Sequence, residues 1–160
     1  MAPSGRVAIR PTTDKVREAV YNALASLDIV VGARVVDLYA GSGALGIEAL
    51  SRGAVHCTFV ERDRAAVAAI DENIATLGLR DRSTIIVGDA MTTAPRIEAD
   101  LAFADPPYDF DDWPRLLRAI SASFVVAEAA APVDPPVDWE QGRTKRYGRT
   151  WVTFLHRELP

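Results

Sequence analysis

The sequence lacks the marks of a secreted or membrane-embedded protein. It contains one cysteine, Cys57, so no intramolecular disulfide can form, and a lone cysteine suits a reducing compartment. No apolar run approaches the roughly 20 residues that cross a bilayer, and no apolar segment follows Arg6 and Arg10 as a signal peptide would require. We therefore expect a cytoplasmic protein with no membrane partner.

Positive charge and metal-ligand patterns are also scarce. The 18 Lys and Arg against 22 Asp and Glu leave a net charge of −4, which argues against a surface covered with nucleic-acid-binding charge but permits a local basic patch. The only two histidines, His56 and His156, stand in strand-like segments without metal-ligand spacing. We expect no metal, and we expect Cys57 to be a buried core residue.

What is present is an alternation of strand and helix patterns. Strands are expected at residues 35–39, 55–60, 84–87, 101–104, 124–127, 143–147 and 151–156, and helices near 12–27, 44–52, 63–77 and 111–120. This order predicts an α/β fold with a doubly wound, mostly parallel sheet that ends in an antiparallel hairpin around Gly148. At 160 residues the chain fits a single domain, residues 12–160, preceded by an N-terminal arm, residues 1–11.

A glycine-rich loop follows the first expected strand. Gly41, Gly43 and Gly46 have the spacing G-x-G-x-x-G, which allows a tight turn and close approach of a ligand to the backbone. Glu61 ends the second expected strand, 20 residues after Gly41, where an acid accepts hydrogen bonds from ribose hydroxyls. This combination predicts a nucleoside cofactor.

The acids around this loop favour a cationic cofactor. Asp37 stands just ahead of the loop, where it would repel a pyrophosphate and attract the sulfonium and ammonium groups of S-adenosylmethionine. Asp89 follows the third expected strand and is placed to contact an adenine amino group. Arg62, next to Glu61, and Ala90, next to Asp89, complete the predicted cofactor site.

A second motif, Asp105-Pro106-Pro107-Tyr108, ends the fourth expected strand. The prolines stop the strand, because they have no N–H for the ladder, and they leave Asp105 at the carboxyl end of the sheet, where ligands bind. An acid, free backbone carbonyls and an aromatic ring can hold a planar, amino-bearing group such as a nucleobase. Taken alone, the same four residues are equally good turn chemistry.

These motifs together resemble those of Rossmann-like S-adenosylmethionine-dependent methyltransferases. More narrowly, the chain is similar to the bacterial small-subunit ribosomal RNA guanine-N2 methyltransferase family called RsmD. The resemblance rests on residues 10–18, 37–53, 60–61 and 105–108. It implies a seven-stranded class I methyltransferase fold, and transfer of a methyl group from S-adenosylmethionine to guanine N2 in 16S rRNA, leaving S-adenosylhomocysteine.

For this chemistry Asp105 and the carbonyl of Pro106 would orient the amino group, and Tyr108 would stack on the flipped base. No covalent nucleophile is required. Because Cys57 lies inside a strand, methylation of a pyrimidine ring carbon is disfavoured.

Basic residues give candidates for RNA contact. Arg143, Lys145 and Arg146 cluster in the terminal hairpin, and with Arg10 and Arg17 they could form a basic rim for rRNA or a pre-30S particle. The competing interpretation of the hairpin is a solvated edge strand protected by charge. We expect the protein to act as a monomer.

Three other functions are compatible with these motifs. One is a different amino-group methyltransferase, acting on adenine N6 in RNA or DNA or on a protein glutamine. A second is a catalytically idle methyltransferase fold that binds RNA or a partner. The third is a dehydrogenase, which Asp37 and the Asp-Pro-Pro-Tyr motif both disfavour.

Overall fold

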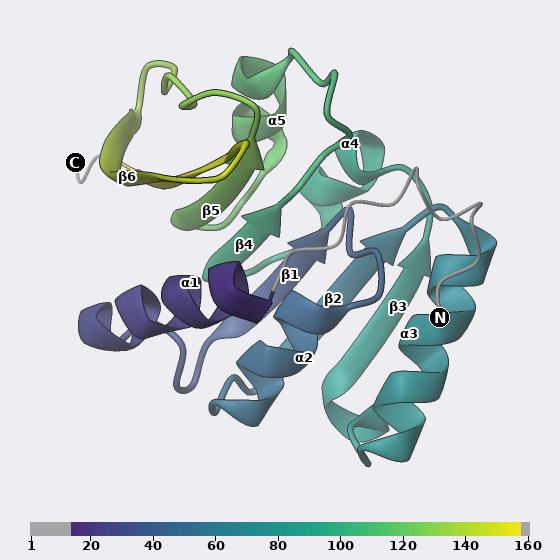
Figure 1. The fold of residues 1–160 in the computed structure, drawn as a ribbon. Coiled ribbons are helices and arrows are strands. Elements are labelled where there is room, and N and C mark those ends of the chain that lie inside the picture. The colour runs from purple at the N-terminus through teal and green to yellow at the C-terminus, as the bar shows by residue number, and fades with distance from the viewer. Residues whose placement is uncertain (1–13, 158–160) are drawn as a thin grey trace.

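The computed structural model describes residues 14–157, which form one seven-stranded sheet flanked by helices (Figure 1). The strands are β1 (Arg34–Leu38), β2 (His56–Glu61), β3 (Ser83–Val87), β4 (Leu101–Ala104), β5 (Phe124–Ala129), β6 (Trp139–Tyr147) and β7 (Thr150–Arg157). Their order across the sheet is β3-β2-β1-β4-β5-β7-β6. The first five strands are parallel, whereas β7 pairs antiparallel with both β5 and β6. The expected α/β fold and its terminal hairpin are confirmed.

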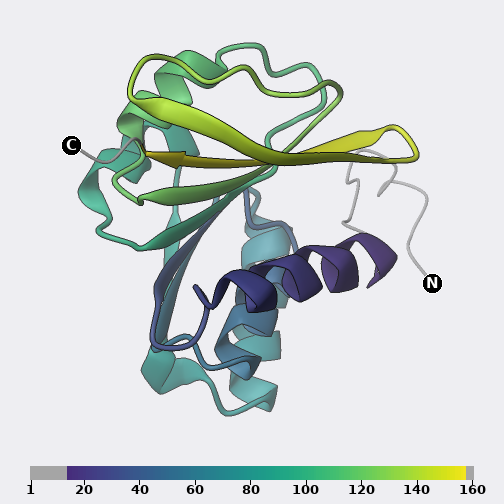
Figure 2. The same cartoon turned by 90° about the vertical axis from the view of Figure 1, so that its left-hand side faces the viewer.

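Helices cover both faces of the sheet. They are α1 (Asp14–Leu27), α2 (Ala44–Ser51), α3 (Arg64–Thr76), α4 (Ala90–Thr93) and α5 (Trp113–Ala119). One core cluster joins α1, α2 and α3 to the sheet, and a second joins α4 and α5 to its other face. Figure 2 shows the β6–β7 hairpin beside α1, and Val152 and Phe154 of β7 belong to the same cluster as Val16 and Val20 of α1.

The central strands are buried on both faces, as expected for parallel strands between two helical layers. In β4, Leu101 and Phe103 pack with α1–α3, while Ala102 and Ala104 pack toward α4 and α5. This is why residues 101–104 read as a continuous apolar run.

Two elements differ from expectation. The short helix α4 was not anticipated, because four residues are too few to show a helical period. Strand β6 begins at Trp139, four residues before the expected strand, and its pairing with β7 is irregular between Gln141 and Thr144. An irregular register interrupts the alternation of buried and exposed residues on which strand prediction depends.

Some predictions fall outside the described residues. The arm predicted for residues 1–11 lies there, and so do Thr12 and Thr13, two of the three N-cap candidates for the first helix. Within residues 14–157, no helix combines the length and apolar character needed to cross a membrane.

Helix α1 is joined to the glycine loop region by one buried tyrosine. Tyr21 is 0% exposed, and its hydroxyl donates a 2.6 Å hydrogen bond to the carbonyl of Leu45, in the first turn of α2. Its ring lies 5.8 Å from that of Phe103, centroid to centroid. Burial, together with nearby Asp37, raises the pKa of this phenol well above its ordinary value, so the hydroxyl stays a donor.

The substitution Tyr21→Phe is expected to lower the free energy of unfolding by about 1 kcal/mol, because it removes a buried hydrogen bond and leaves the ring packing intact. Urea unfolding monitored by circular dichroism measures the change. Tyr147→Phe, which also removes a hydroxyl but from a half-buried hairpin ring, serves as the control. Equal stability losses in the two variants would contradict the role given to the Tyr21 hydroxyl.

Candidate active site

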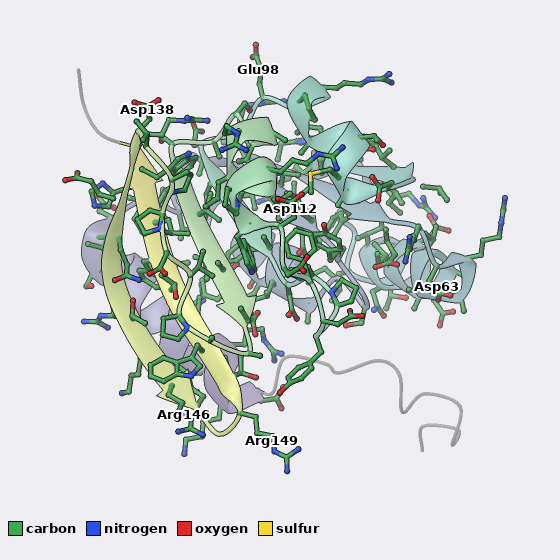
Figure 3. All side chains as sticks on the ribbon, turned by 90° about the horizontal axis from the view of Figure 1, so that it is seen from above. Asp63, Glu98, Asp112, Asp138, Arg146 and Arg149 are labelled. Carbon is green, nitrogen blue, oxygen red and sulfur yellow. The ribbon has the colours of Figure 1, made fainter. Side chains whose placement is uncertain are left out.

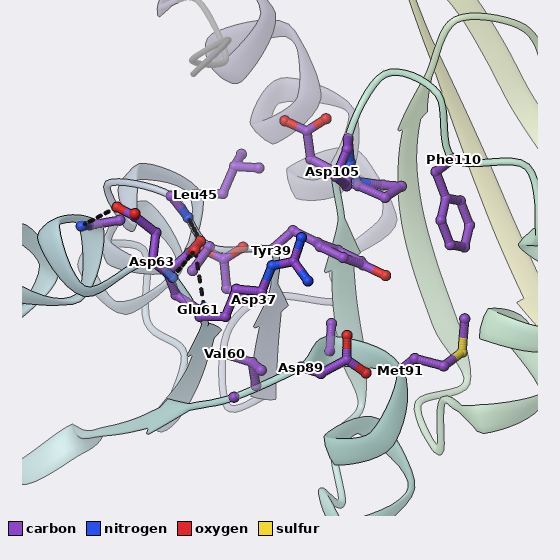
Figure 4. Close-up of a pocket in the computed structure, with 18 of the residues that line it drawn as sticks. Asp37, Tyr39, Leu45, Val60, Glu61, Asp63, Asp89, Met91, Asp105 and Phe110 are labelled. Carbon is purple, nitrogen blue, oxygen red and sulfur yellow. Dashed lines mark hydrogen bonds between the residues drawn. The ribbon is translucent and has the colours of Figure 1, made fainter. Parts of the chain in front are cut away.

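A cavity of about 790 Å³ opens at the carboxyl ends of the parallel strands (Figure 4). This volume falls within the range of small-molecule and cofactor sites. Of the predicted site residues, those that line it are Asp37, Gly41, Glu61, Arg62, Asp89, Ala90, Asp105, Pro106 and Tyr108. Residues from both predicted motifs therefore share one cavity.

The three glycines of the loop have different physical reasons to be glycine. Gly41 lines the cavity with a φ of +59°, a left-handed conformation that a side chain would disfavour. Gly43, a predicted cofactor residue, is buried and does not line the cavity. A Cβ there would meet side-chain atoms of Ile70 and Phe59 at 3.2 and 3.3 Å. At Gly46 a Cβ would lie 2.5 Å from a ring carbon of Phe59, so this glycine lets α2 approach β2.

Glu61 organises the loop around its carboxylate. Its Oε1 accepts a 2.8 Å hydrogen bond from the backbone N–H of Gly41, and its Oε2 accepts from the N–H groups of Arg62 and Asp63 at 3.1 and 2.9 Å. Each carboxylate oxygen has two lone pairs, so Oε1 can accept one further hydrogen bond. Glu61 is thus fixed in place and still able to receive a ligand hydroxyl.

Asp37 is the most buried acid of the cavity, at 2% exposure. Its Oδ2 accepts a 3.1 Å hydrogen bond from the N–H of Gly46, which fixes the first turn of α2. Burial raises the pKa of this carboxyl well above its ordinary value; the Gly46 hydrogen bond opposes the rise, and the charges of Asp105, Glu128 and Glu61 add to it. The predicted cofactor residue therefore also has a structural role that its position in the sequence did not reveal.

Asp89 caps the helix that was not anticipated. Its Oδ2 accepts a 3.0 Å hydrogen bond from the N–H of Thr92, in the first turn of α4. One carboxylate oxygen is thereby committed to the helix, and the other is left for a ligand.

Tyr39, predicted only as the last residue of a strand, is part of the cavity wall. It has a φ of +59°, and its ring centroid lies 6.3 Å from that of Phe110, which lines the same cavity. Burial raises the pKa of its phenol to about 12; the charge of Asp89 adds to the rise, and that of Arg62 opposes it. The position of Tyr39 directly before the glycine loop could have indicated this role, because a bulky residue is unusual in a tight turn that follows a strand.

The acceptor motif lies where the fourth strand ends. Asp105 is half-buried, Pro106 is buried, and Tyr108 is 62% exposed at the rim. In Figure 4 Asp105 and Asp89 stand on opposite sides of the cavity, with Tyr39 between them. The cavity can therefore hold one ligand against the loop and a second against Asp105.

The predicted RNA-contact residues are spread over different parts of the structure. Arg143, Lys145 and Arg146 are exposed on β6, the edge strand of the sheet, and none lines the cavity. The Lys145 ammonium lies 5.5 Å from the ring centroid of Tyr147, and the Arg146 guanidinium 5.9 Å from that of Trp151. Figure 3 shows Arg146 and Arg149 projecting at one end of the hairpin.

Arg17 differs from the other basic candidates, because its guanidinium already forms ion pairs with acidic side chains. Its guanidinium lies 2.9 Å from the carboxylate of Asp14 and 3.6 Å from that of Glu48. The pair with Asp14 lies within α1, whereas the pair with Glu48 connects α1 to α2. The structure therefore gives Arg17 a role between helices that the prediction of RNA contact did not include. Arg10 lies outside the described residues.

Metal ligands do not gather in the part of the chain that the structure describes. Within residues 14–157 there is no group of three or more His, Cys, Asp or Glu side chains placed to hold an ion. His56 instead lies 3.0 Å from the hydroxyl of Thr84, and burial lowers its pKa.

Comparison with known proteins identifies the family. A family model described as conserved hypothetical protein 95 matches residues 2–156. Ribosomal RNA small subunit methyltransferase D of Escherichia coli is 41% identical over 102 residues, which cover 62% of this chain and 50% of that protein. The chain belongs to this RsmD-like family of methyltransferases.

Two further relatives match nearly the whole chain. YlbH of Bacillus subtilis is 39% identical over 163 residues, covering 92% of this chain and 88% of that protein. The solved structure of yhhF from Escherichia coli has a TM-score of 0.84 at 31% identity and covers 96% of this chain and 90% of that one. The RsmD-like chain thus matches both the sequence and the architecture of methyltransferases along most of its length, although it spans only half of the Escherichia coli RsmD sequence.

The raised pKa of Asp37 predicts a pH-dependent effect of Asp37→Asn on stability. The folded state holds the Asp37 proton to higher pH than the unfolded state does, so the stability of the native protein falls as pH rises from about 4 through the folded-state pKa. Asparagine keeps an oxygen for the Gly46 N–H and does not titrate. The stability of Asp37→Asn relative to the native protein should therefore increase with pH over this interval.

Urea unfolding of both proteins between pH 4 and pH 8 checks this expectation. Asp63→Asn, an exposed acid that caps α3, serves as the control. A stability difference for Asp37→Asn that is constant with pH would show that the buried carboxyl titrates normally.

Proposed function

We propose that this RsmD-like protein transfers a methyl group from S-adenosylmethionine to the exocyclic N2 of a guanine in 16S rRNA. The observation that carries the proposal is the single cavity that Asp105 and Pro106 share with the glycine loop and Glu61. The name of the Escherichia coli relative, ribosomal RNA small subunit methyltransferase D, supports the choice of substrate.

The residues around the loop fit this cofactor. Glu61 has a lone pair free for a ribose hydroxyl, and Gly41 leaves space beside it. Asp89 adds negative charge, which suits a ligand that carries sulfonium and ammonium charges. Such charges beside Asp37 would oppose the burial that raises its pKa and would favour its ionised form. Arg62 and Ala90 line the same cavity. When bound, the cofactor supplies an electrophilic methyl group.

Asp105 and Pro106 prepare the acceptor nitrogen. The lone pair of an exocyclic amine is delocalised into its base, so the amine is a poor nucleophile until its N–H groups are held out of the ring plane. The Asp105 carboxylate and the Pro106 carbonyl can each accept one N–H, which aims the lone pair and stabilises the positive charge that develops on nitrogen. Asp105 can then accept the proton that the methylated nitrogen releases.

The exposure of Tyr108 and the burial of Cys57 also favour nitrogen as the acceptor of the methyl group. The ring of Tyr108 is 62% exposed and can stack on a flipped base, a contact worth about 1–3 kcal/mol. Cys57 is 0% exposed and burial raises its pKa, so it is unsuited to the nucleophilic role that methylation of a ring carbon requires. The chemistry of the cavity therefore favours an amino group.

We further propose that residues 12–160 act as one domain, as a monomer in the cytoplasm, on rRNA or on a pre-30S particle. The two core clusters, which run from α1 to β7 across one sheet, support the single domain.

Asp105→Ala is expected to lower kcat by at least about 100-fold, because it removes the group that orients the amine. Binding of S-adenosylmethionine, measured by calorimetry, should change little. Asp109→Ala removes the same charge from an exposed position that does not line the cavity, and it should remain active. A fully active Asp105→Ala variant would remove Asp105 from the mechanism.

The substrate is tested by mapping the methyl groups of 16S rRNA from a strain in which the gene is deleted. The proposal requires one N2-methylguanine to disappear and to return when the gene is restored. Full methylation of small-subunit guanines in the deletion strain would refute the proposed substrate.

The hairpin is expected to contribute to RNA binding. Lys145→Glu with Arg146→Glu should weaken binding to rRNA. The decrease of log K with log salt should also become less steep, by about 2 in slope, because two phosphate contacts are lost. Arg64→Glu with Arg96→Glu makes the same change of charge at exposed positions outside the hairpin and the cavity. Equal binding by the two double variants would remove the hairpin from the RNA-binding surface.

A further inference from the structure

Two charged side chains at the start of α5, Asp112 and Arg115, line the cavity and belong to neither predicted motif. They stand three positions apart, from the N-cap to the first turn of α5, a spacing at which opposite charges can pair. Asp14 and Arg17 do so at 2.9 Å in α1. In the part of the chain that the structure describes, Asp112 and Arg115 form no ion pair with each other or with another residue.

Asp112 is also not used to cap its own helix. It occupies the N-cap position of α5 without a hydrogen bond from its side chain, whereas Asp63 and Asp89 accept backbone N–H groups at 2.9 and 3.0 Å in the same position of α3 and α4. Pro114, in the first turn of α5, has no N–H to offer. The carboxylate of Asp112 therefore remains available as an acceptor at the edge of the cavity, where Figure 3 shows it from above.

An aromatic wall lies beside these two groups. The ring of Phe110 meets that of Trp113 edge to face at 5.4 Å and stands 6.3 Å from that of Tyr39. Phe110, Tyr108 and Asp105 line the same cavity as Asp112 and Arg115. One hydrogen-bond acceptor and one strong donor thus line the cavity in which the proposed base is held.

We propose that Asp112 and Arg115 select guanine by reading its Watson–Crick edge. The inference rests on the proposed function and adds the residues that choose the base. Guanine presents the N1–H donor next to its amino group and the O6 acceptor beyond it. The Asp112 carboxylate accepts the N1–H, and the Arg115 guanidinium donates to O6.

Adenine reverses this pattern, because its N1 is an acceptor and its 6-amino group is a donor. An adenine in the same position would set a lone pair against the Asp112 carboxylate and an N–H against the Arg115 guanidinium. Leaving these charged groups unpaired is costly, so the arrangement rejects adenine as well as accepting guanine.

The test compares two acceptors, guanine and 2-aminopurine, at the target position found by methyl mapping. 2-Aminopurine keeps the amino group that is methylated and lacks both O6 and the N1–H. The rRNA carrying either base is used directly, or assembled into particles if the naked RNA is not methylated. We expect the native protein to prefer guanine by at least about 10-fold in kcat/KM.

Arg115→Gln and Asp112→Ala should each lower kcat/KM for guanine and leave that for 2-aminopurine nearly unchanged, so the preference collapses. Arg118→Gln removes the same charge one turn further along α5, from an exposed position that does not line the cavity, and should keep the full preference. Calorimetry with S-adenosylmethionine reports whether each variant keeps an intact cofactor site.

Two results would overturn the inference while leaving the proposed function intact. One is a native protein that methylates both bases equally. The other is an Arg115→Gln variant that loses activity by the same factor on both bases, which would mean that Arg115 holds a phosphate. Absence of methylation of the guanine substrate by the native protein would instead refute the proposed function itself.

Discussion

The geometry of the cavity depends on the carboxylate of Glu61, which joins the end of β2 to the loop that follows β1. Three backbone N–H groups converge on it, from Gly41 on one side and from Arg62 and Asp63 on the other. Without this acceptor, three backbone N–H groups at the cavity wall would need water or the ligand as their hydrogen-bond acceptor. The same side chain that would bind a ribose therefore also shapes the loop before any ligand arrives.

The loop is held from its other end by α1 and α2. Asp37 accepts the N–H of Gly46, Tyr21 donates to the carbonyl of Leu45, and Arg17 lies between Asp14 and Glu48. These contacts come from helices and a strand rather than from other loops, so the glycine loop is supported by rigid elements. Such support keeps binding groups in position when the ligand is absent.

The sequence predicted the sheet and most of the cavity because both depend on local patterns. Runs such as 101–104 end at prolines, and the glycine spacing sits between a strand and a helix, so Glu61, Asp89 and Asp105 could be assigned to strand ends. Contacts between distant segments were not predictable in this way. The partners of Asp37 and Arg17, and the place of Tyr39 beside Phe110, arise only when α1, α2 and α5 pack on the sheet.

Although the net charge is −4, the protein has one surface rich in acidic side chains and another rich in basic ones. Acids line the cavity at the ends of the parallel strands. Arg143, Lys145 and Arg146 instead lie on β6, the antiparallel strand at one edge of the sheet. A cavity that attracts a cationic cofactor would repel the phosphates of an RNA, so the same residues cannot serve both ligands. Addition of the antiparallel β6–β7 hairpin to the parallel sheet separates the two groups of charges in space. Arg62 and Arg115 place positive charge among the acids of the cavity, and Arg115 lines it where we propose that a base is held.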